Sequence, residues 1–213
     1  MCVSSEVEDE ATGLFHLDLA TSFERETNMK KSLITLVAGA ALAITSFAAN
    51  AQMKDPDVGG AAMYPTKNIV ENAVNSPIHK TLVAAVKAAG LVDTLEGAGP
   101  FTVFAPTDDA FAKLPAGTVD NLVKPENHDT LVKILTYHVV PGKITTKDLK
   151  EWIKKGNGTY SAKTVEGGML TFTEHMGKIK ITDEKGGSAE ITTANVYQSN
   201  GMIQVINAVL MPN

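Results

Sequence analysis

Residues 99–114 constrain the fold more than any other stretch of this chain, because they encode a strand, a turn and a helix start without interruption. The first part is rich in aromatic and β-branched residues and lies between two prolines, which favours a short buried strand. Its residues are Phe101, Thr102, Val103, Phe104 and Ala105. Pro106 has no N–H to donate, so strand pairing should stop there.

The second part of this stretch predicts a helix that begins after Thr107. The threonine hydroxyl can accept a hydrogen bond from a backbone N–H of the first turn, and Asp108 and Asp109 place negative charge at the positive end of the helix. Phe111 and Leu114 then share one face of the helix and can fold back over the strand. We expect a strand–helix corner that nucleates a core, and we find no candidate nucleophile or base in it.

The composition is that of a globular protein and argues against nucleic-acid binding. The 213 residues are 44% apolar and 20% charged, with a net charge of −5, which allows one good-sized core. Residues 52–213 contain 17 acidic residues and 16 lysines but no arginine. Since arginine is the usual residue for bidentate phosphate recognition, its absence there argues against a phosphate, nucleotide or nucleic-acid site.

Residues 29–51 have the pattern of a secretory signal peptide. Two lysines follow Met29, an apolar run comes next, and Ala-Asn-Ala fits a cleavage site that ends at Ala51. We therefore predict cleavage between Ala51 and Gln52 and a secreted or periplasmic protein. The alternative is a membrane anchor, but the apolar run is shorter than the ~20 residues that a spanning helix needs. A lipoprotein would need cysteine where Gln52 stands, so no stable membrane anchor is expected after cleavage.

The segments on either side of this signal are predicted to lie outside the folded domain. Residues 1–28 contain seven acidic residues and one base, which would hinder export, so we interpret them as an extension upstream of the true start at Met29. The only cysteine, Cys2, falls in that extension, and the mature chain should therefore contain no disulfide or thiolate metal site. Residues 52–67 combine Gly and Pro with no periodicity and predict a flexible leader before a single domain over residues 68–213.

The hydrophobic period changes along this domain from that of helices to that of strands. Helical patterns are expected over residues 68–75, 80–89, 118–123 and 125–138, with one further turn around Asp148 and Leu149. After residue 158, alternation predicts strands over 169–174, 178–182 and 189–191, and near-continuous apolar strands over 202–206 and 209–211. Helices early and a strand meander late indicate the α+β class.

Three motifs together resemble the fasciclin-like domain family. Residues 99–111 resemble its first signature, and Tyr-His-Val-Val-Pro-Gly at 137–142 resembles its central Tyr-His segment. Residues 200–212 are similar to its closing signature and include Gly201, Ile203, Val205 and Ile206. The three occur in the family's order and spacing, and the resemblance spans about residues 68–212. Asp108 stands where the family often has Asn, and Gln204 stands where His is frequent; neither change is expected to affect the core.

The resemblance implies a wedge of β-sheet packed against several short helices, in a secreted or surface-held protein without a catalytic centre or cofactor. It also implies a role in cell adhesion or extracellular interaction. We therefore expect a non-catalytic binding module for a protein or an envelope polysaccharide. The candidate contact residues are those of the central segment: Tyr137, His138, Val139, Val140 and Pro141.

The roles of the first two of these residues have plainer alternatives. His138 could be an interaction residue, a base or a metal ligand, but a lone histidine at the end of an apolar helix face is more typical of a core residue with its ring nitrogens bonded to backbone. Tyr137 is expected to cover the edge of the core with its hydroxyl in water. The other histidines lack partners at the spacing of a helical metal site, so no metal is expected.

A second function, from a different class, is a carrier or sensor of small molecules. Its pocket would lie between the sheet and the helices and would be lined by Phe101, Phe104, Phe111 and Phe172. Against this alternative, the same side chains are needed to fill the core of a domain of this size.

Overall fold

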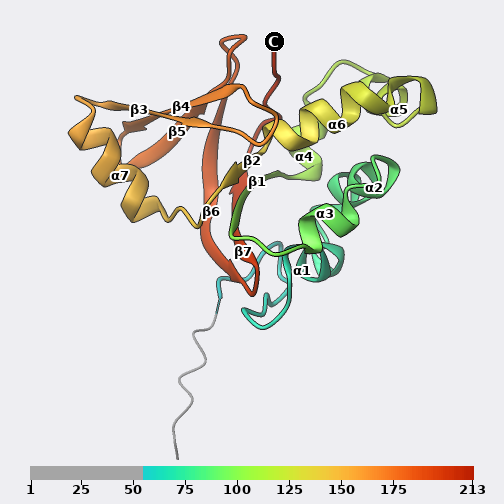
Figure 1. The fold of residues 1–213 in the computed structure, drawn as a ribbon, viewed down its shortest axis with the longest axis horizontal. Helices are drawn as coiled ribbons and strands as arrows, with labels where there is room; N and C mark the ends of the chain where they lie inside the picture. The colour runs from blue at the N-terminus through green and yellow to red at the C-terminus, as the bar shows by residue number, and fades with distance from the viewer. Residues whose placement is uncertain (1–54) are drawn as a thin grey trace, which may run out of the picture. The chain divides into compact units, whose positions relative to one another are not determined.

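The computed structural model describes residues 55–213, so the predicted upstream extension, signal peptide and cleavage site at Ala51 and Gln52 lie outside the described residues. The described chain contains helices α1 (Ile69–Asn75), α2 (Lys80–Ala88), α3 (Val92–Glu96), α4 (Asp108–Ala112), α5 (Thr118–Leu122), η1 (Pro125–Asn127), α6 (His128–Tyr137) and α7 (Thr146–Lys155) (Figure 1). Its strands are β1 (Phe101–Pro106), β2 (Val139–Pro141), β3 (Thr159–Lys163), β4 (Met169–His175), β5 (Lys178–Thr182), β6 (Ser188–Gln198) and β7 (Gly201–Ile206).

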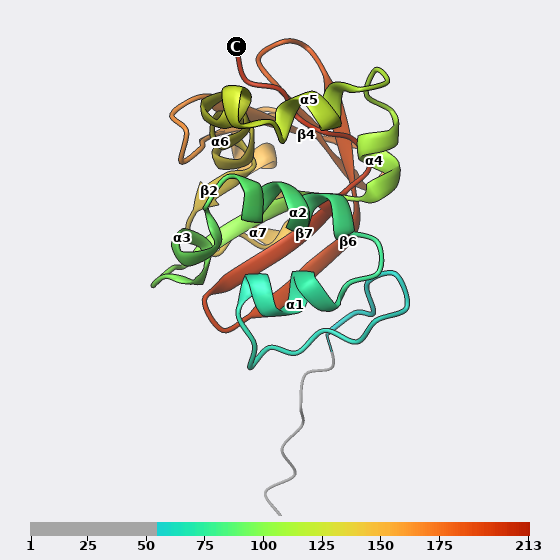
Figure 2. The ribbon, with the colours of Figure 1, turned by 90° about the vertical axis from the view of Figure 1, so that its right-hand side faces the viewer.

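The strands form one mixed sheet in the order β2-β1-β7-β6-β5-β4-β3. Strands β1 and β7 are parallel, with Phe101 opposite Gly201, and every other neighbouring pair is antiparallel. The sheet curls until its two edges approach each other. A hydrogen bond of 2.8 Å from the N–H of Val165, just after β3, to the carbonyl of Val139 in β2 marks where they meet. The result is the α+β wedge of sheet and short helices that the sequence predicted (Figures 1 and 2).

The described chain has one apolar core on each side of β1 and β7. Val103 and Ala105 of β1 belong to the core beneath helices α1 to α3, which we call the helix-side core. Phe104 faces the other way, into a core that α7 closes against the curled sheet, and its ring lies 5.4 Å from that of Phe172. Because β1 and β7 are buried on both faces, their sequences are largely apolar instead of alternating, with Thr102 and Gln204 as the buried polar exceptions.

The corner predicted over residues 99–114 is present. Strand β1 ends at Pro106, and the hydroxyl of Thr107 accepts a hydrogen bond of 3.2 Å from the N–H of Ala110 as the cap of α4. Phe111 is buried in the helix-side core. This part of the fold follows from local sequence chemistry.

Asp108 has a role that the sequence did not reveal. Its carboxylate accepts hydrogen bonds from the backbone N–H groups of Lys80, at 3.3 Å, and Thr81, at 2.8 Å, in the first turn of α2. His79, at the N-cap of α2, makes no side-chain hydrogen bond to the helix. A residue 28 positions away from Lys80 therefore caps α2.

Two segments differ from the sequence predictions near the ends of the domain. The flexible leader does not hold for residues 55–67, because Val58 and Met63 are buried in the helix-side core and Asp55 accepts a hydrogen bond of 3.0 Å from the N–H of Tyr197. Residues 209–211 form no strand, although Leu210 is fully buried. Apolar side chains in both segments complete the core without regular structure.

Two further differences concern α7 and β3. The single turn predicted around Asp148 lies within the ten-residue helix α7, which Thr145 and Asp148 begin with a capping box. Strand β3 is absent from the sequence-based predictions. Its residues TYSAK do alternate, with Tyr160 half-buried and Ala162 buried between exposed residues, but the strand is short and only these two side chains are apolar.

Candidate functional site

The central Tyr-His segment lies at the seam where the sheet closes on itself. Tyr137 ends α6, His138 is the C-cap of that helix, and Val139 and Val140 begin β2. The side chains of these four residues are buried, and among the five predicted contact residues only Pro141 is exposed. The segment therefore joins structural elements, and it offers little of its own side-chain surface to a partner.

Tyr137 is tied by its hydroxyl group to strand β4 and to the turn between β5 and β6. The hydroxyl donates to the carbonyl of Met169 over 2.8 Å and accepts from the N–H of Glu184 over 3.1 Å. The prediction of a hydroxyl in water is wrong, because these two backbone groups replace the water. Burial raises the pKa of Tyr137 to about 12, so the hydroxyl stays protonated and keeps its donor.

His138 is a core histidine whose two ring nitrogens both make hydrogen bonds to backbone groups. Nδ1 lies 2.8 Å from the carbonyl of Ile134, and Nε2 accepts a hydrogen bond of 3.0 Å from the N–H of Leu210. Since Nε2 must be unprotonated to accept, the proton is on Nδ1, which donates. Burial lowers the pKa of His138 to about 4 and favours this neutral ring. A role as base or metal ligand would require the ring to release Leu210.

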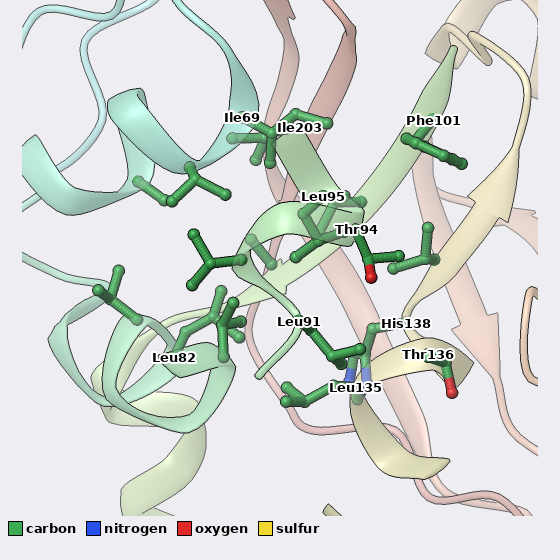
Figure 3. A pocket seen from close by; sticks show the side chains of 18 of the residues that line it. Ile69, Leu82, Leu91, Thr94, Leu95, Phe101, Leu135, Thr136, His138 and Ile203 are labelled. Carbon is green, nitrogen blue, oxygen red and sulfur yellow. The ribbon is translucent and has the colours of Figure 1, made fainter. Parts of the chain in front are cut away.

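An apolar pocket lies beside this histidine, between helices α1 to α3 and the sheet (Figure 3). Its empty space is about 840 Å³, counting the part that is open to solvent. The helices contribute Ile69, Val70, Ala73, Leu82, Val83, Val86, Lys87, Leu91, Val92, Thr94 and Leu95. The sheet and the end of α6 contribute Phe101, Val103, Phe104, Ala105, Leu135, Thr136, His138, Val139 and Ile203, and Val165 follows β3.

The position of this pocket agrees with the alternative prediction, but its lining agrees only in part. Phe101 lines it, and Phe104 borders it although the Phe104 ring packs in the core on the other side of β1. Phe172 lies in that other core, and Phe111 lies elsewhere in the helix-side core. The four phenylalanines come from β1, α4 and β4, and the packing of these elements decides which of them meet in one space. The apolar stripe of α2 was the one sequence signal for the actual pocket wall. It predicted that this face of the helix points inward, but it did not show what the face packs against.

Within residues 55–213, no group of three or more His, Cys, Asp or Glu side chains is arranged to hold a metal ion. None of the helices in this part of the chain is both long and apolar enough to cross a membrane.

Comparisons with known proteins match this architecture. The family model of the Fasciclin domain matches residues 77–212. The chain is 48% identical over 159 residues to Protein sll1483 of Synechocystis sp., covering 75% of this chain and 81% of that protein. It is 37% identical to Immunogenic protein MPB70 of Mycobacterium bovis, covering 66% of each chain. It is 34% identical to Cell surface glycolipoprotein MPB83 of the same species, covering 73% of this chain and 64% of that protein.

Solved structures give the same result for the fold. The FAS1 domain pair of the insect cell adhesion molecule Fasciclin I superposes with a TM-score of 0.55 at 19% sequence identity, covering 74% of this chain and 57% of that one. At this level of identity, the similarity concerns the fold alone.

Proposed function

The chain belongs to the fasciclin domain family, and on that ground we propose that it is an exported, non-catalytic binding module that contacts a protein or an envelope polysaccharide. The family match over residues 77–212 is the observation that carries the proposal. It is supported by relatives whose names place them at the cell surface, by a structural neighbour from a cell adhesion molecule, and by the signal-peptide pattern of residues 29–51.

The contact surface we propose includes Pro141, the exposed end of the Tyr-His segment, together with exposed Tyr64 and Lys143 and half-buried Lys67 and Tyr197. We call Tyr64, Lys67, Pro141, Lys143 and Tyr197 the aromatic surface. The ammonium of Lys67 lies 4.9 Å from the ring centre of Tyr64, and that of Lys143 lies 4.9 Å from the ring centre of Tyr197. Tyr64 is 50% exposed. Aromatic rings flanked by cations suit contacts with protein or sugar, because they combine apolar area with hydrogen-bonding groups.

Backbone contacts hold the parts of the aromatic surface near one another. The N–H of Ser199 donates to the carbonyl of Lys67 over 2.9 Å, and the N–H of Tyr197 donates to the carboxylate of Asp55. The segment before α1 is thereby fixed beside the turn between β6 and β7. A surface built on several fixed elements loses less conformational entropy on binding than a mobile loop does.

Site-specific photocrosslinking in the native host tests this proposal. A photoreactive phenylalanine analogue at Tyr64 should crosslink to one envelope protein or to cell-wall polysaccharide. The same analogue at Met176, which is 89% exposed in the turn between β4 and β5, should give no such product. Equal products from both positions, or none from either, would contradict the proposed surface.

A second candidate function is a carrier of small apolar molecules, and the pocket beside His138 favours it. Mass spectrometry of protein purified from its own host under native conditions tests this candidate. A bound molecule that leaves on denaturation would support a carrier, and a bare protein mass would count against it.

A further inference from the structure

We propose that the pocket beside His138 binds the hydrocarbon chain of a single-chain carboxylate amphiphile, such as a fatty acid, with the carboxylate at the mouth near Lys87. The inference specifies the ligand class of the carrier function, and it rests on that function. It is independent of the aromatic surface, whose residues Tyr64, Lys67, Pro141, Lys143 and Tyr197 do not line the pocket.

The interior of the pocket requires a hydrocarbon ligand. Its inner wall is aliphatic and aromatic, and includes Leu82, Val86, Leu95 and Ile203. His138 is the one polar side chain deep in this wall, and both of its ring nitrogens already bond to backbone groups. A ligand atom that needs a hydrogen bond would find none there, and burying it would be unfavourable.

The dimensions of the pocket favour a slender ligand over a bulky one. About 840 Å³ is empty when the part open to solvent is included, but the cavity volume proper is only about 60 Å³. The space is therefore narrow. Figure 3 shows Leu91 lying beside His138, in the segment that joins α2 to α3. A single alkyl chain fits a narrow apolar space, whereas fused rings or two chains would have to push the helices apart.

The mouth of the pocket has the chemistry of a carboxylate site. Lys87, Thr94 and Thr136 are its polar residues besides His138, and Lys87 and Thr94 are exposed. Lys87 is the only one of the lining residues with a permanent charge, and it forms none of the ion pairs found in the described chain. A cation at the rim of an apolar pocket attracts an anionic head group while the chain enters the interior.

Calorimetric titration with dodecanoate, decanoate and dodecanol, each below its aggregation concentration, tests the inference. The protein is produced from the full-length reading frame and purified in the form that the cell makes. Dodecanoate should bind with one-to-one stoichiometry, and each methylene removed should weaken binding about fourfold. Dodecanoate should bind about 1.5- to fivefold more tightly than dodecanol, and Lys87→Met should abolish that difference. Lys80→Met, on the same helix but outside the pocket lining, should preserve it.

A second pair of variants tests the location of the chain. Val83→Phe places a ring in the pocket and should weaken dodecanoate binding at least tenfold. Val74→Phe, at a position that is 51% exposed on α1 and does not line the pocket, should leave binding unchanged. Methyl NMR spectra of the unaltered protein give the same information if a variant does not fold. Dodecanoate should shift the signals of Leu82, Val86 and Leu95 but leave those of Leu149 and Leu170 in the other core.

The outcomes separate the inference from the carrier function. Equal binding of dodecanol and dodecanoate, or a preference that survives Lys87→Met, overturns the carboxylate assignment and keeps an apolar carrier. Absence of binding by all three compounds overturns both. Binding that shifts no methyl group of the pocket overturns the location.

Discussion

The imidazole Nε2 of His138 accepts a hydrogen bond of 3.0 Å from the backbone N–H of Leu210, so the end of α6 holds the chain 72 residues later. The other ring nitrogen, Nδ1, bonds to the carbonyl of Ile134, one turn back in α6. One neutral side chain thus connects a helix end, the seam of the sheet and the C-terminal segment. His138, which the sequence analysis named as a candidate contact residue, links these three parts of the described chain by hydrogen bonds.

The first prediction concerns pH. The pKa of His138 is about 4 in the folded protein, against 6.5 for an exposed histidine ring, so the unfolded chain takes up a proton first as pH falls. Its contribution to the free energy of unfolding is therefore fully present above pH 6.5 and is lost as pH falls toward 4, by roughly 3 kcal/mol in total. The hydrogen bond to the carbonyl of Ile134 and the charge of nearby Asp183 act to raise this pKa but are outweighed by burial.

Urea unfolding at several pH values between about 7.5 and 4 measures this loss. His138→Gln should be less stable at the upper end of this range and should show a smaller loss of stability on acidification than the unaltered protein. His128→Gln, at an exposed position on the same helix, should keep the full pH dependence. An undiminished slope in His138→Gln would show that other groups are responsible.

The second prediction concerns the hydroxyl of Tyr137. Tyr137→Phe keeps the ring but leaves the carbonyl of Met169 and the N–H of Glu184 without their partner. We expect a loss of about 1–3 kcal/mol in the free energy of unfolding, because buried polar groups without partners are unfavourable. Tyr137→Ala should cost more, about 3–5 kcal/mol, since it also opens a cavity. Thermal unfolding compares the two, and equal midpoints for Tyr137→Phe and the unaltered protein would contradict the role of the hydroxyl.

The third prediction concerns the cap of α2. Asp108→Ala removes the acceptor of the N–H groups of Lys80 and Thr81 and should lower stability by about 1–2 kcal/mol. Asp109→Ala is the matched control, because Asp109 is exposed and lies in the same first turn of α4. It should change stability by no more than about 0.5 kcal/mol. Similar losses for both variants would mean that charge at α4, and not the cap of α2, is what matters.

The fourth prediction concerns Gln204, which is fully buried in β7. Its amide nitrogen donates to the carbonyl of Ile144 and to the side chain of Asn195, each over 3.1 Å, and its oxygen accepts from the N–H of Asn195 over 2.9 Å. Gln204→Leu leaves these groups unpaired and should cost about 3 kcal/mol. Ile206→Val, at an equally buried position of β7, should cost only about 0.5–1.5 kcal/mol in the same denaturant titration. A loss for Gln204→Leu no larger than that for Ile206→Val would contradict the importance of these hydrogen bonds.

Local sequence determined the corner at residues 99–114, the hairpin between β4 and β5, and the fold class. In each case the decisive chemistry lies within a few residues. Pro106 and Thr107 end a strand and cap a helix by their own bonding properties. Alternation places Leu170 and Phe172 inward, as the structure confirms. Such features depend on local backbone preferences and on the hydrophobic period, and both can be read from the sequence alone.

Tertiary structure alone decided which distant groups meet. Asp108 caps a helix that begins 28 residues earlier, and Gln204 bonds to Asn195 on the neighbouring strand β6, so the two departures from the family pattern both take part in hydrogen bonds that sequence periodicity does not encode. The pocket beside His138 follows the same rule, because its walls come from α1, α2, α3, β1, β2, α6 and β7. A cavity is the space that several elements leave between them, and that space is set by their packing, not by any one segment.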